Sequence, residues 1–266
     1  MIEKLHTHLR PLERVAVAYS GGVDSTLVLK AALDVLGSEH VVALLAVSPS
    51  LPQSEKDEAV ALAQQLGARL ELLPTEETND PAYQANAPNR CYFCKDHVYR
   101  ALRQFAEQNG IAHVLDGMNA EDTLDVRPGR AAARELKILS PLHDLGFSKK
   151  DVREAAQALG LPNWNKPAAA CLASRVPYGT SVTPKLLSQI ERAEAALFDL
   201  GYRELRVRHH GDVARLEVPE ADLMRALQQR EEITAALRAV GYTYITLDLA
   251  GLRTGSMNEV LKARST

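Results

Sequence analysis

Apolar and polar residues follow one another in blocks along the first two thirds of the chain, and the blocks have the lengths of strands and helices. Continuous apolar runs at 15–19 and 41–47 predict buried strands, because a strand covered on both faces loses its polar alternation. Each run is followed by a segment with helical spacing, at 24–36 and 54–66, that ends at a glycine. Strands that alternate with helices predict a parallel sheet with helices on both faces.

The same alternation continues to about residue 160. Further strands are predicted at 69–73, 112–116 and 137–139, and further helices at 96–108 and 149–159. The last helix has well-marked ends, because Ser148 and Asp151 have the spacing of a capping box and Gly160 follows the last turn.

The pattern changes after this helix. Residues 161–179 are rich in proline and small side chains and have no clear period, which is typical of a linker or a binding loop. Beyond them the sequence predicts a helix, a hairpin, a second helix and a strand, at 183–200, 204–208 with 213–218, 219–240 and 243–249. We therefore predict an α/β fold with a parallel-sheet domain at 1–175 and a smaller α+β domain at 176–266.

The composition is that of a globular protein. Of the 266 residues, 46% are hydrophobic and 24% are charged, which excludes disordered and fibrous chains. The first residues carry charges without an apolar core, and the longest apolar run, 41–47, is too short to cross a bilayer. We therefore expect a cytoplasmic protein without a membrane partner. The net charge of -3 argues against a broad nucleic-acid-binding surface.

The loop between the first strand and the first helix, residues 20–25 with the sequence SGGVDS, has the features of an anion site. Backbone N–H groups and the positive end of the helix attract negative charge, and the glycines let the backbone approach a phosphate closely. The loop lacks the Gly-Lys-Ser/Thr ending of a Walker A motif and is not a GxGxxG fingerprint. The alternative is a tight turn with a capping serine.

SGGVDS resembles the PP-loop of ATP pyrophosphatases, a superfamily that includes GMP synthetase, NAD synthetase, argininosuccinate synthase and the tRNA thiolases. The resemblance implies that ATP adenylylates a substrate and that pyrophosphate leaves. It also implies that Ser48, after the second strand, lies beside the adenine. The residues that it assigns to the phosphates and Mg²⁺ are Ser20, Gly21, Gly22, Asp24 and Ser25.

Three further segments, at 116–135, 140–153 and 161–179, resemble the LarE family of ATP-dependent sulfur transferases. The resemblance covers nearly the whole chain. It implies that carboxylates of pyridinium-3,5-biscarboxylic acid mononucleotide are adenylylated and converted to thiocarboxylates, for the nickel-pincer nucleotide of lactate racemase. It also implies a homo-oligomer that draws on a separate sulfide source.

The polar segment DGMNAEDTLD suits contacts to Mg²⁺ and ribose, because a hard cation prefers oxygen ligands. The candidates in it are Asp116, Asn119, Asp122 and Asp125, each with a solvated loop residue as the alternative. Arg127, which precedes a Pro-Gly turn, offers a guanidinium, and a surface salt bridge is its alternative.

Arg206 and Arg208 stand two residues apart in a predicted strand, so both side chains point to one face. With His209 and His210 at the turn they would form a phosphate clamp, and a solvated sheet face is the alternative. The family resemblance favours the phosphate of the mononucleotide. It also places three further residues near substrate or metal, namely Ser174, Arg175 and Glu194.

The chain contains three cysteines, Cys91, Cys94 and Cys171. The C-x-x-C spacing of the first two lets two thiolates meet one metal centre. A zinc ribbon needs a second C-x-x-C pair, which this sequence lacks. Three alternatives remain open: a zinc site completed by His97, buried inert thiols, and a redox pair.

In the LarE family, members with one cysteine, at the position of Cys171, give up its sulfur, whereas members with three are thought to hold a 4Fe-4S cluster with one open iron. We therefore expect a 4Fe-4S cluster on Cys91, Cys94 and Cys171, with sacrificial donation by Cys171 as the alternative. The predicted catalytic residues are Cys171, Asp24, Ser174 and Arg175. A tRNA thiolase and an adenine-nucleotide sensor without catalytic activity remain as rival functions.

Overall fold

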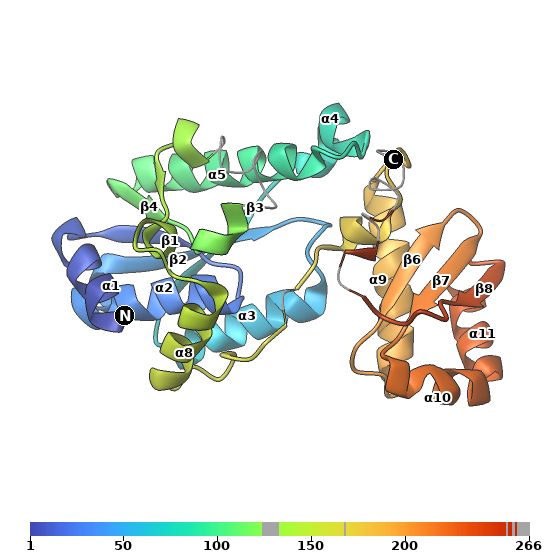
Figure 1. Cartoon of the computed structure of the whole chain (residues 1–266). Helices are drawn as coiled ribbons and strands as arrows, with labels where there is room; N and C mark the ends of the chain where they lie inside the picture. The colour runs from blue at the N-terminus through green and yellow to red at the C-terminus, as the bar shows by residue number, and fades with distance from the viewer. Residues whose placement is uncertain (124–132, 168, 254, 257–258, 260–266) are drawn as a thin grey trace. The chain divides into compact units, whose positions relative to one another are not determined.

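A computed structural model describes residues 1–123, 133–167, 169–253, 255–256 and 259 of the chain. It divides into two compact units, which are described separately below (Figure 1). The first comprises Met1–Asp80 and Asn89–Ala169, and the second comprises Pro81–Pro88 and Ala170–Thr266.

The segment 81–88 belongs to the second unit although the sequence around it belongs to the first. The Asn86 side chain donates hydrogen bonds to the carbonyl oxygens of Val176, Pro177 and Thr180, at 3.3, 2.8 and 3.1 Å. No periodic pattern in the sequence indicates this excursion.

The first unit is built on a five-stranded parallel sheet with the strand order β3-β2-β1-β4-β5. Its strands are β1 (Val15–Ala18), β2 (Val41–Val47), β3 (Arg69–Pro74), β4 (His113–Leu115) and β5 (Ile138–Leu139). The chain leaves β1 toward β2 on one side and later returns to β4 on the other. In such sheets, ligands bind at the carboxyl ends of the strands where the order reverses. A ligand site is therefore expected at the carboxyl end of β1. The parallel sheet also confirms the predicted α/β fold.

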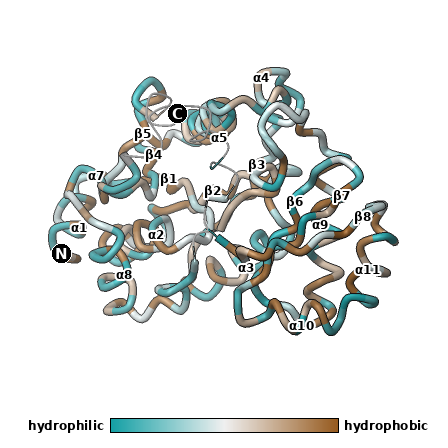
Figure 2. The backbone as a smooth tube through the Cα atoms, turned by 45° about the vertical axis from the view of Figure 1, so that its right-hand side comes forward, coloured by the Kyte–Doolittle hydropathy of each residue, from teal (hydrophilic) through white to brown (hydrophobic). Residues whose placement is uncertain are grey.

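Helices cover both faces of this sheet (Figure 1). One face carries α1 (Ile2–Leu9), α2 (Val23–Leu36), α3 (Gln53–Gln65) and α8 (Lys149–Ala158), which share one apolar core with β1 and β2. The other face carries α5 (Arg90–Gln108), whose Tyr99 and Leu102 pack with Ala16, Leu44 and Val114 of the strands. Figure 2 shows hydrophobic colouring along the central strands and α2 and hydrophilic colouring on many outer turns.

The second unit contains a three-stranded sheet with the order β6-β7-β8. The strand β6 (Arg206–His210) pairs antiparallel with β7 (Val213–Glu217), which confirms the predicted hairpin, and β8 (Tyr244–Leu247) runs parallel to β7. The helices α9 (Pro184–Asp199) and α11 (Arg230–Ala239) cover one face of the sheet.

Short helical elements complete the described residues. The short α-helices are α4 (Pro81–Gln84), α7 (Pro141–Asp144) and α10 (Leu223–Gln228). The 3-10 turns are η1 (Arg10–Leu12), η2 (Ser38–His40), η3 (Glu77–Asn79), η4 (Ala120–Thr123), η5 (Leu172–Arg175) and η6 (Glu220–Asp222). Among the described residues, no helix is both long enough and apolar enough to pass through a bilayer.

Two helix boundaries differ from the prediction. The helix α5 begins at Arg90 rather than at residue 96, so Cys91 and Cys94 lie in its first two turns. Its N-cap residue, Asn89, is of a type that favours this position, but its side chain makes no capping hydrogen bond. The helix predicted at 219–240 is interrupted at Gln229, where the backbone leaves the helical region with φ -92° and ψ 21°.

Candidate active site

The loop between β1 and α2 depends on a glycine. Gly21 has a φ of +74°, and a Cβ atom on it would lie 2.8 Å from the Cβ of Ala59 on α3. Both the left-handed backbone and this contact exclude a side chain. The N-cap of α2 is Gly22, and no side chain caps the helix. The N–H groups of its first turn are therefore available to an anionic ligand.

Hydroxyl groups close the loop on itself. The Ser25 Oγ donates to the Gly22 carbonyl at 3.1 Å and accepts from the Ser20 N–H at 3.2 Å. The Thr26 Oγ1 donates to the same Gly22 carbonyl at 2.8 Å. These bonds occupy the carbonyl oxygen at the helix start, so that it does not compete with an incoming phosphate.

Asp24, in the first turn of α2, and Asn119, in the segment after β4, meet beside β1. The Asn119 Nδ2 donates to the Asp24 Oδ1 at 2.9 Å, while its own Oδ1 accepts from the N–H groups of Glu121 and Asp122. Burial raises the pKa of the Asp24 carboxyl, the bond from Asn119 opposes this rise, and the charge of Asp122 adds to it. A half-buried carboxylate in this setting is a fitting ligand for Mg²⁺, since a cation would offset the cost of its charge.

Asp116 is buried and has both oxygens occupied. The Tyr99 hydroxyl donates to its Oδ2 at 2.8 Å, and the Met118 N–H donates to its Oδ1 at 3.1 Å. Burial, followed by the charge of Asp116, raises the pKa of Tyr99, so the hydroxyl keeps its proton. Asp116 thus holds the turn after β4 through both carboxylate oxygens, and its predicted role as a ligand stays a prediction.

Gly117 brings this turn against the start of α2. A Cβ atom on Gly117 would lie 2.6 Å from the backbone nitrogen of Ser25. The sequence reading overlooked both Gly117 and Tyr99. Gly117 has a weak sequence signal, because it follows directly after an acidic residue at a strand end, whereas Tyr99 has none.

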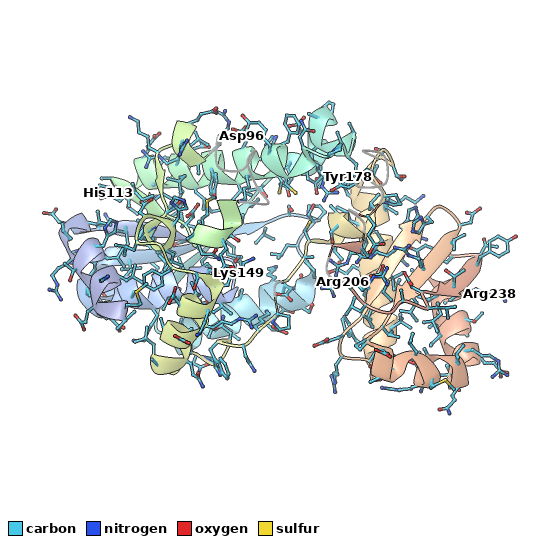
Figure 3. The ribbon with its side chains drawn as sticks, viewed as in Figure 1. Asp96, His113, Lys149, Tyr178, Arg206 and Arg238 are labelled. Atoms are coloured by element: carbon cyan, nitrogen blue, oxygen red, sulfur yellow. The ribbon has the colours of Figure 1, made fainter. Side chains whose placement is uncertain are left out.

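Other predicted positions of the first unit lie as follows. Ser48 follows β2, and its Oγ accepts from the Ser50 N–H at 3.2 Å. Asp122 accepts from the Asn119 N–H at 3.1 Å, and the Lys149 ammonium lies 3.8 Å from its other oxygen (Figure 3 labels Lys149). Two predicted residues, Asp125 and Arg127, lie outside the described residues.

In the second unit a buried ion pair holds the backbone around Cys171. The Arg175 guanidinium donates from Nε and Nη2 to the two oxygens of Glu194, at 3.0 and 2.9 Å. Its Nη1 donates to the Cys171 carbonyl at 2.9 Å. Glu194 also accepts from the Val207 N–H at 3.0 Å, so its carboxylate is fully engaged. Arg175 and Glu194 therefore position the Cys171 segment.

The two predicted clamp arginines have different surroundings. Arg208 is buried and donates to Glu217 at 2.7 Å and to the Ser174 carbonyl at 3.1 Å. Arg206, by contrast, has no carboxylate of the described residues within ion-pair distance (Figure 3). Burial lowers the pKa of Arg206, and the charge of Arg175 lowers it further. The charges of Glu194 and Glu217 oppose this decrease only in part, and an anionic ligand would stabilise the guanidinium further.

The histidines beside this clamp contribute little positive charge. Burial lowers the pKa of His209 and the charge of His210 lowers it further, and the His209 Nδ1 lies 3.3 Å from the Tyr242 hydroxyl. Burial and then the charge of Arg215 lower the pKa of His210. Both rings are therefore mostly neutral at pH 7.

The three cysteines form no disulfide. Cys91 is exposed and Cys94 is partly buried, both in the first two turns of α5, while exposed Cys171 precedes η5 in the second unit. The His97 Nε2 pairs with the Asp80 Oδ2 at 2.9 Å. Within the described part of the chain, no three His, Cys, Asp or Glu side chains are gathered as a metal site. The chemistry of three thiols still fits an iron-sulfur cluster, and the exposure of Cys91 and Cys171 argues against inert buried thiols.

Comparisons with known proteins extend the picture. The family model of NAD synthase matches residues 3–110. A pyridinium-3,5-bisthiocarboxylic acid mononucleotide synthase of Lactiplantibacillus plantarum is 44% identical over 253 residues, which cover 95% of this chain and 92% of that protein. An uncharacterised protein of Synechocystis sp. is 45% identical over 262 residues, which cover 98% and 97% of the two chains. An argininosuccinate synthase of Haloarcula marismortui is 27% identical over 56% of this chain and 37% of its own length.

Proposed function

This chain belongs to the LarE family of PP-loop enzymes, and from this premise we propose that it is an ATP-dependent sulfur transferase. Its substrate is pyridinium-3,5-biscarboxylic acid mononucleotide, and its product carries thiocarboxylates for the nickel-pincer nucleotide of lactate racemase. The observation that carries the proposal is the 44% identity, over 95% of the chain, to a synthase of the bisthiocarboxylic acid mononucleotide.

The first step takes place at the loop after β1. A substrate carboxylate attacks the α-phosphorus of ATP, the bond to the β-phosphate oxygen breaks, and pyrophosphate leaves. The first-turn N–H groups of α2 and the hydroxyls of Ser20 and Ser25 receive the phosphates. Asp24, held by Asn119, is the carboxylate that would bind Mg²⁺, which neutralises the leaving pyrophosphate when bound.

The second step forms the carbon–sulfur bond. A nucleophilic sulfur attacks the acyl carbon of the adenylate, and AMP leaves with the oxygen, because phosphate is a far better leaving group than oxide. Cys91, Cys94 and Cys171 are the residues that would hold a 4Fe-4S cluster, which supplies an exchangeable sulfide when bound. In the alternative, the sulfur of Cys171 itself is transferred.

Arg206 binds the phosphate of the mononucleotide in this proposal. Its charge lacks a carboxylate partner among the described residues, whereas Arg208 already pairs with Glu217. The remaining predictions are a cytoplasmic location and a homo-oligomer with a separate sulfide source. We also predict that residues 1–175 form the PP-loop ATP pyrophosphatase domain and residues 176–266 the substrate-binding and sulfur transferase domain.

A pyrophosphate-release assay with the biscarboxylic acid mononucleotide and Mg-ATP tests the activity. Release that requires the mononucleotide supports the proposal. Release that requires tRNA would favour a thiolase of the same superfamily, and ATP binding without release would favour a nucleotide sensor.

The sulfur donor needs a separate experiment. The protein is reconstituted anaerobically with iron and sulfide, and its spectrum and its mass after turnover are recorded. We expect a cluster absorption that is lost in Cys91→Ser, Cys94→Ser and Cys171→Ser and an intact Cys171 after turnover. Conversion of Cys171 to dehydroalanine in protein without iron would instead establish sacrificial donation.

A further inference from the structure

The segment that follows α8 makes direct contact with the loop after β1. The Asn163 Nδ2 donates to the Gly21 carbonyl oxygen at 3.0 Å and to the Thr26 Oγ1 at 3.0 Å. Thr26 in turn donates to the Gly22 carbonyl. The Asn163 amide therefore binds Gly21 directly and binds Gly22 through the Thr26 hydroxyl.

Asn163 sits on a segment that is tethered to α3. The Lys166 ammonium lies 2.7 Å from carboxylate oxygens of both Glu55 and Glu58. Burial tends to lower the pKa of Lys166, but the hydrogen bonds that its ammonium donates to the two carboxylates outweigh this effect and raise the pKa. The Lys166 N–H also donates to the Asn163 carbonyl at 3.0 Å, so the tether and the amide lie in one turn.

The loop is thus held from two sides. Gly21 packs against Ala59 of α3, and its carbonyl oxygen is bound by Asn163 from the opposite segment. A groove of about 460 Å³ runs between α3 and this segment, and its lining includes Gly21, Glu58, Asn163, Asn165 and Lys166.

We propose that Asn163 is a positioning residue of the nucleotide site, an inference that rests on the proposed use of ATP. Its two N–H bonds keep the Gly21 carbonyl turned toward the segment, so that N–H groups rather than a carbonyl oxygen face the phosphates. The Asn163 Oδ1 is buried and has no partner among the described residues, so the donors of the amide carry the contact. An aspartate at this position would place an oxygen against the Gly21 carbonyl and lose both donors.

The test compares Asn163→Asp with Asn165→Asp in the full-length protein. Asn165 is exposed and lines the same groove, so its variant adds the same negative charge without breaking a bond to the loop. In calorimetry, Asn163→Asp should weaken the binding of Mg-ATP about tenfold, or by about 1.4 kcal/mol. Asn165→Asp should leave the affinity for Mg-ATP nearly unchanged. AMP, which lacks the β- and γ-phosphates, should lose little affinity in either variant.

A second measurement does not depend on ATP. In the unliganded protein, amide hydrogen exchange across residues 20–26 should be faster in Asn163→Asp than in Asn165→Asp. Equal ATP affinities for the two variants, an equal loss for ATP and AMP, or equal exchange rates would each overturn the inference. Failure of the wild-type protein to bind ATP would instead overturn the proposed function, and the exchange comparison would still decide the role of Asn163 in the loop.

Discussion

Gly117 and Gly21 show how closely two backbone segments approach in this site. A side chain at Gly117 would meet backbone atoms of Ser25, which cannot move without displacing the helix start. A side chain at Gly21 would meet Ala59 and would also require a strained φ. Glycine is therefore required at both positions by contact, and the polar side chains of the site depend on that contact.

The substitution Gly117→Ala should lower the free energy of unfolding by about 3 kcal/mol, because the added methyl group overlaps immobile backbone. The control is Gly67→Ala, where φ is +67° but no atom lies within 4 Å of the added Cβ, and where about 1 kcal/mol is expected. Urea denaturation measures both. Equal stabilities of the two variants would contradict the predicted overlap.

Asp24, the proposed Mg²⁺ ligand, should oppose folding near neutral pH. Its folded-state pKa is raised, mainly by burial, so the folded chain binds a proton more readily than the unfolded chain does. The resulting stability is present below the ordinary pKa of an aspartate and is lost as pH rises through the raised pKa. Asp24→Asn should therefore raise the melting temperature at pH 7.5, with a gain that shrinks toward pH 4.

The same Asp24→Asn variant should release pyrophosphate roughly a hundredfold more slowly, because a neutral amide is a poor substitute for a charged ligand at the transition state. Scanning calorimetry at several pH values and a pyrophosphate assay give the two results. A melting-temperature gain that is constant with pH would show that burial of the Asp24 charge is not the cause.

Among the helices and strands, those with a strong local signal were predicted best. The capping box at the start of α8 is present, since Ser148 accepts from the Asp151 N–H at 3.1 Å and the Asp151 carboxylate accepts from the Ser148 N–H at 2.9 Å. The strands β1 and β2 match their continuous apolar runs. The start of α5 was predicted six residues late, although Asn89, a favoured N-cap residue type, directly precedes it.

Ser148→Ala should lower the free energy of unfolding by about 1 kcal/mol through the lost cap. It should also loosen the first turn of α8, where the Lys149 N–H donates to Glu121 beside the crevice. Ser38→Ala, at an exposed serine, is the matched control, with an expected change within about 0.5 kcal/mol. Chemical denaturation distinguishes the two, and a change of equal size in both variants would count against the cap.

The protein as a whole divides into units that sequence composition does not delimit well. The predicted boundary after residue 175 would separate Arg175 from the buried carboxylate of Glu194, although the two form a bidentate ion pair within the second unit. The contacts of Asn86 likewise belong to the second unit across a long stretch of sequence. The domain limits and roles remain predictions that truncation can test.

Of two fragments that both lack the segment 81–88, residues 176–266 should be less stable than residues 170–266 by about 3–5 kcal/mol, because Glu194 is then buried without its partner. Circular dichroism during heating compares the two. Adding Glu194→Gln to the shorter fragment should recover part of the loss. Indistinguishable melting of the two fragments would show that Arg175 is dispensable for the second unit.

Local patterns in the chain were sufficient for the alternation of strands and helices and for the glycine loop between the first strand and the first helix, and they identified the three candidate thiols. These features depend on neighbours a few positions apart, where periodicity and backbone preference act directly. The pairing of Asn119 with Asp24, 95 positions apart, and of Asn163 with Gly21, 142 apart, depends on strand order and on the path of a segment without regular period. Such contacts arise from packing of the complete chain, and no local pattern encodes them.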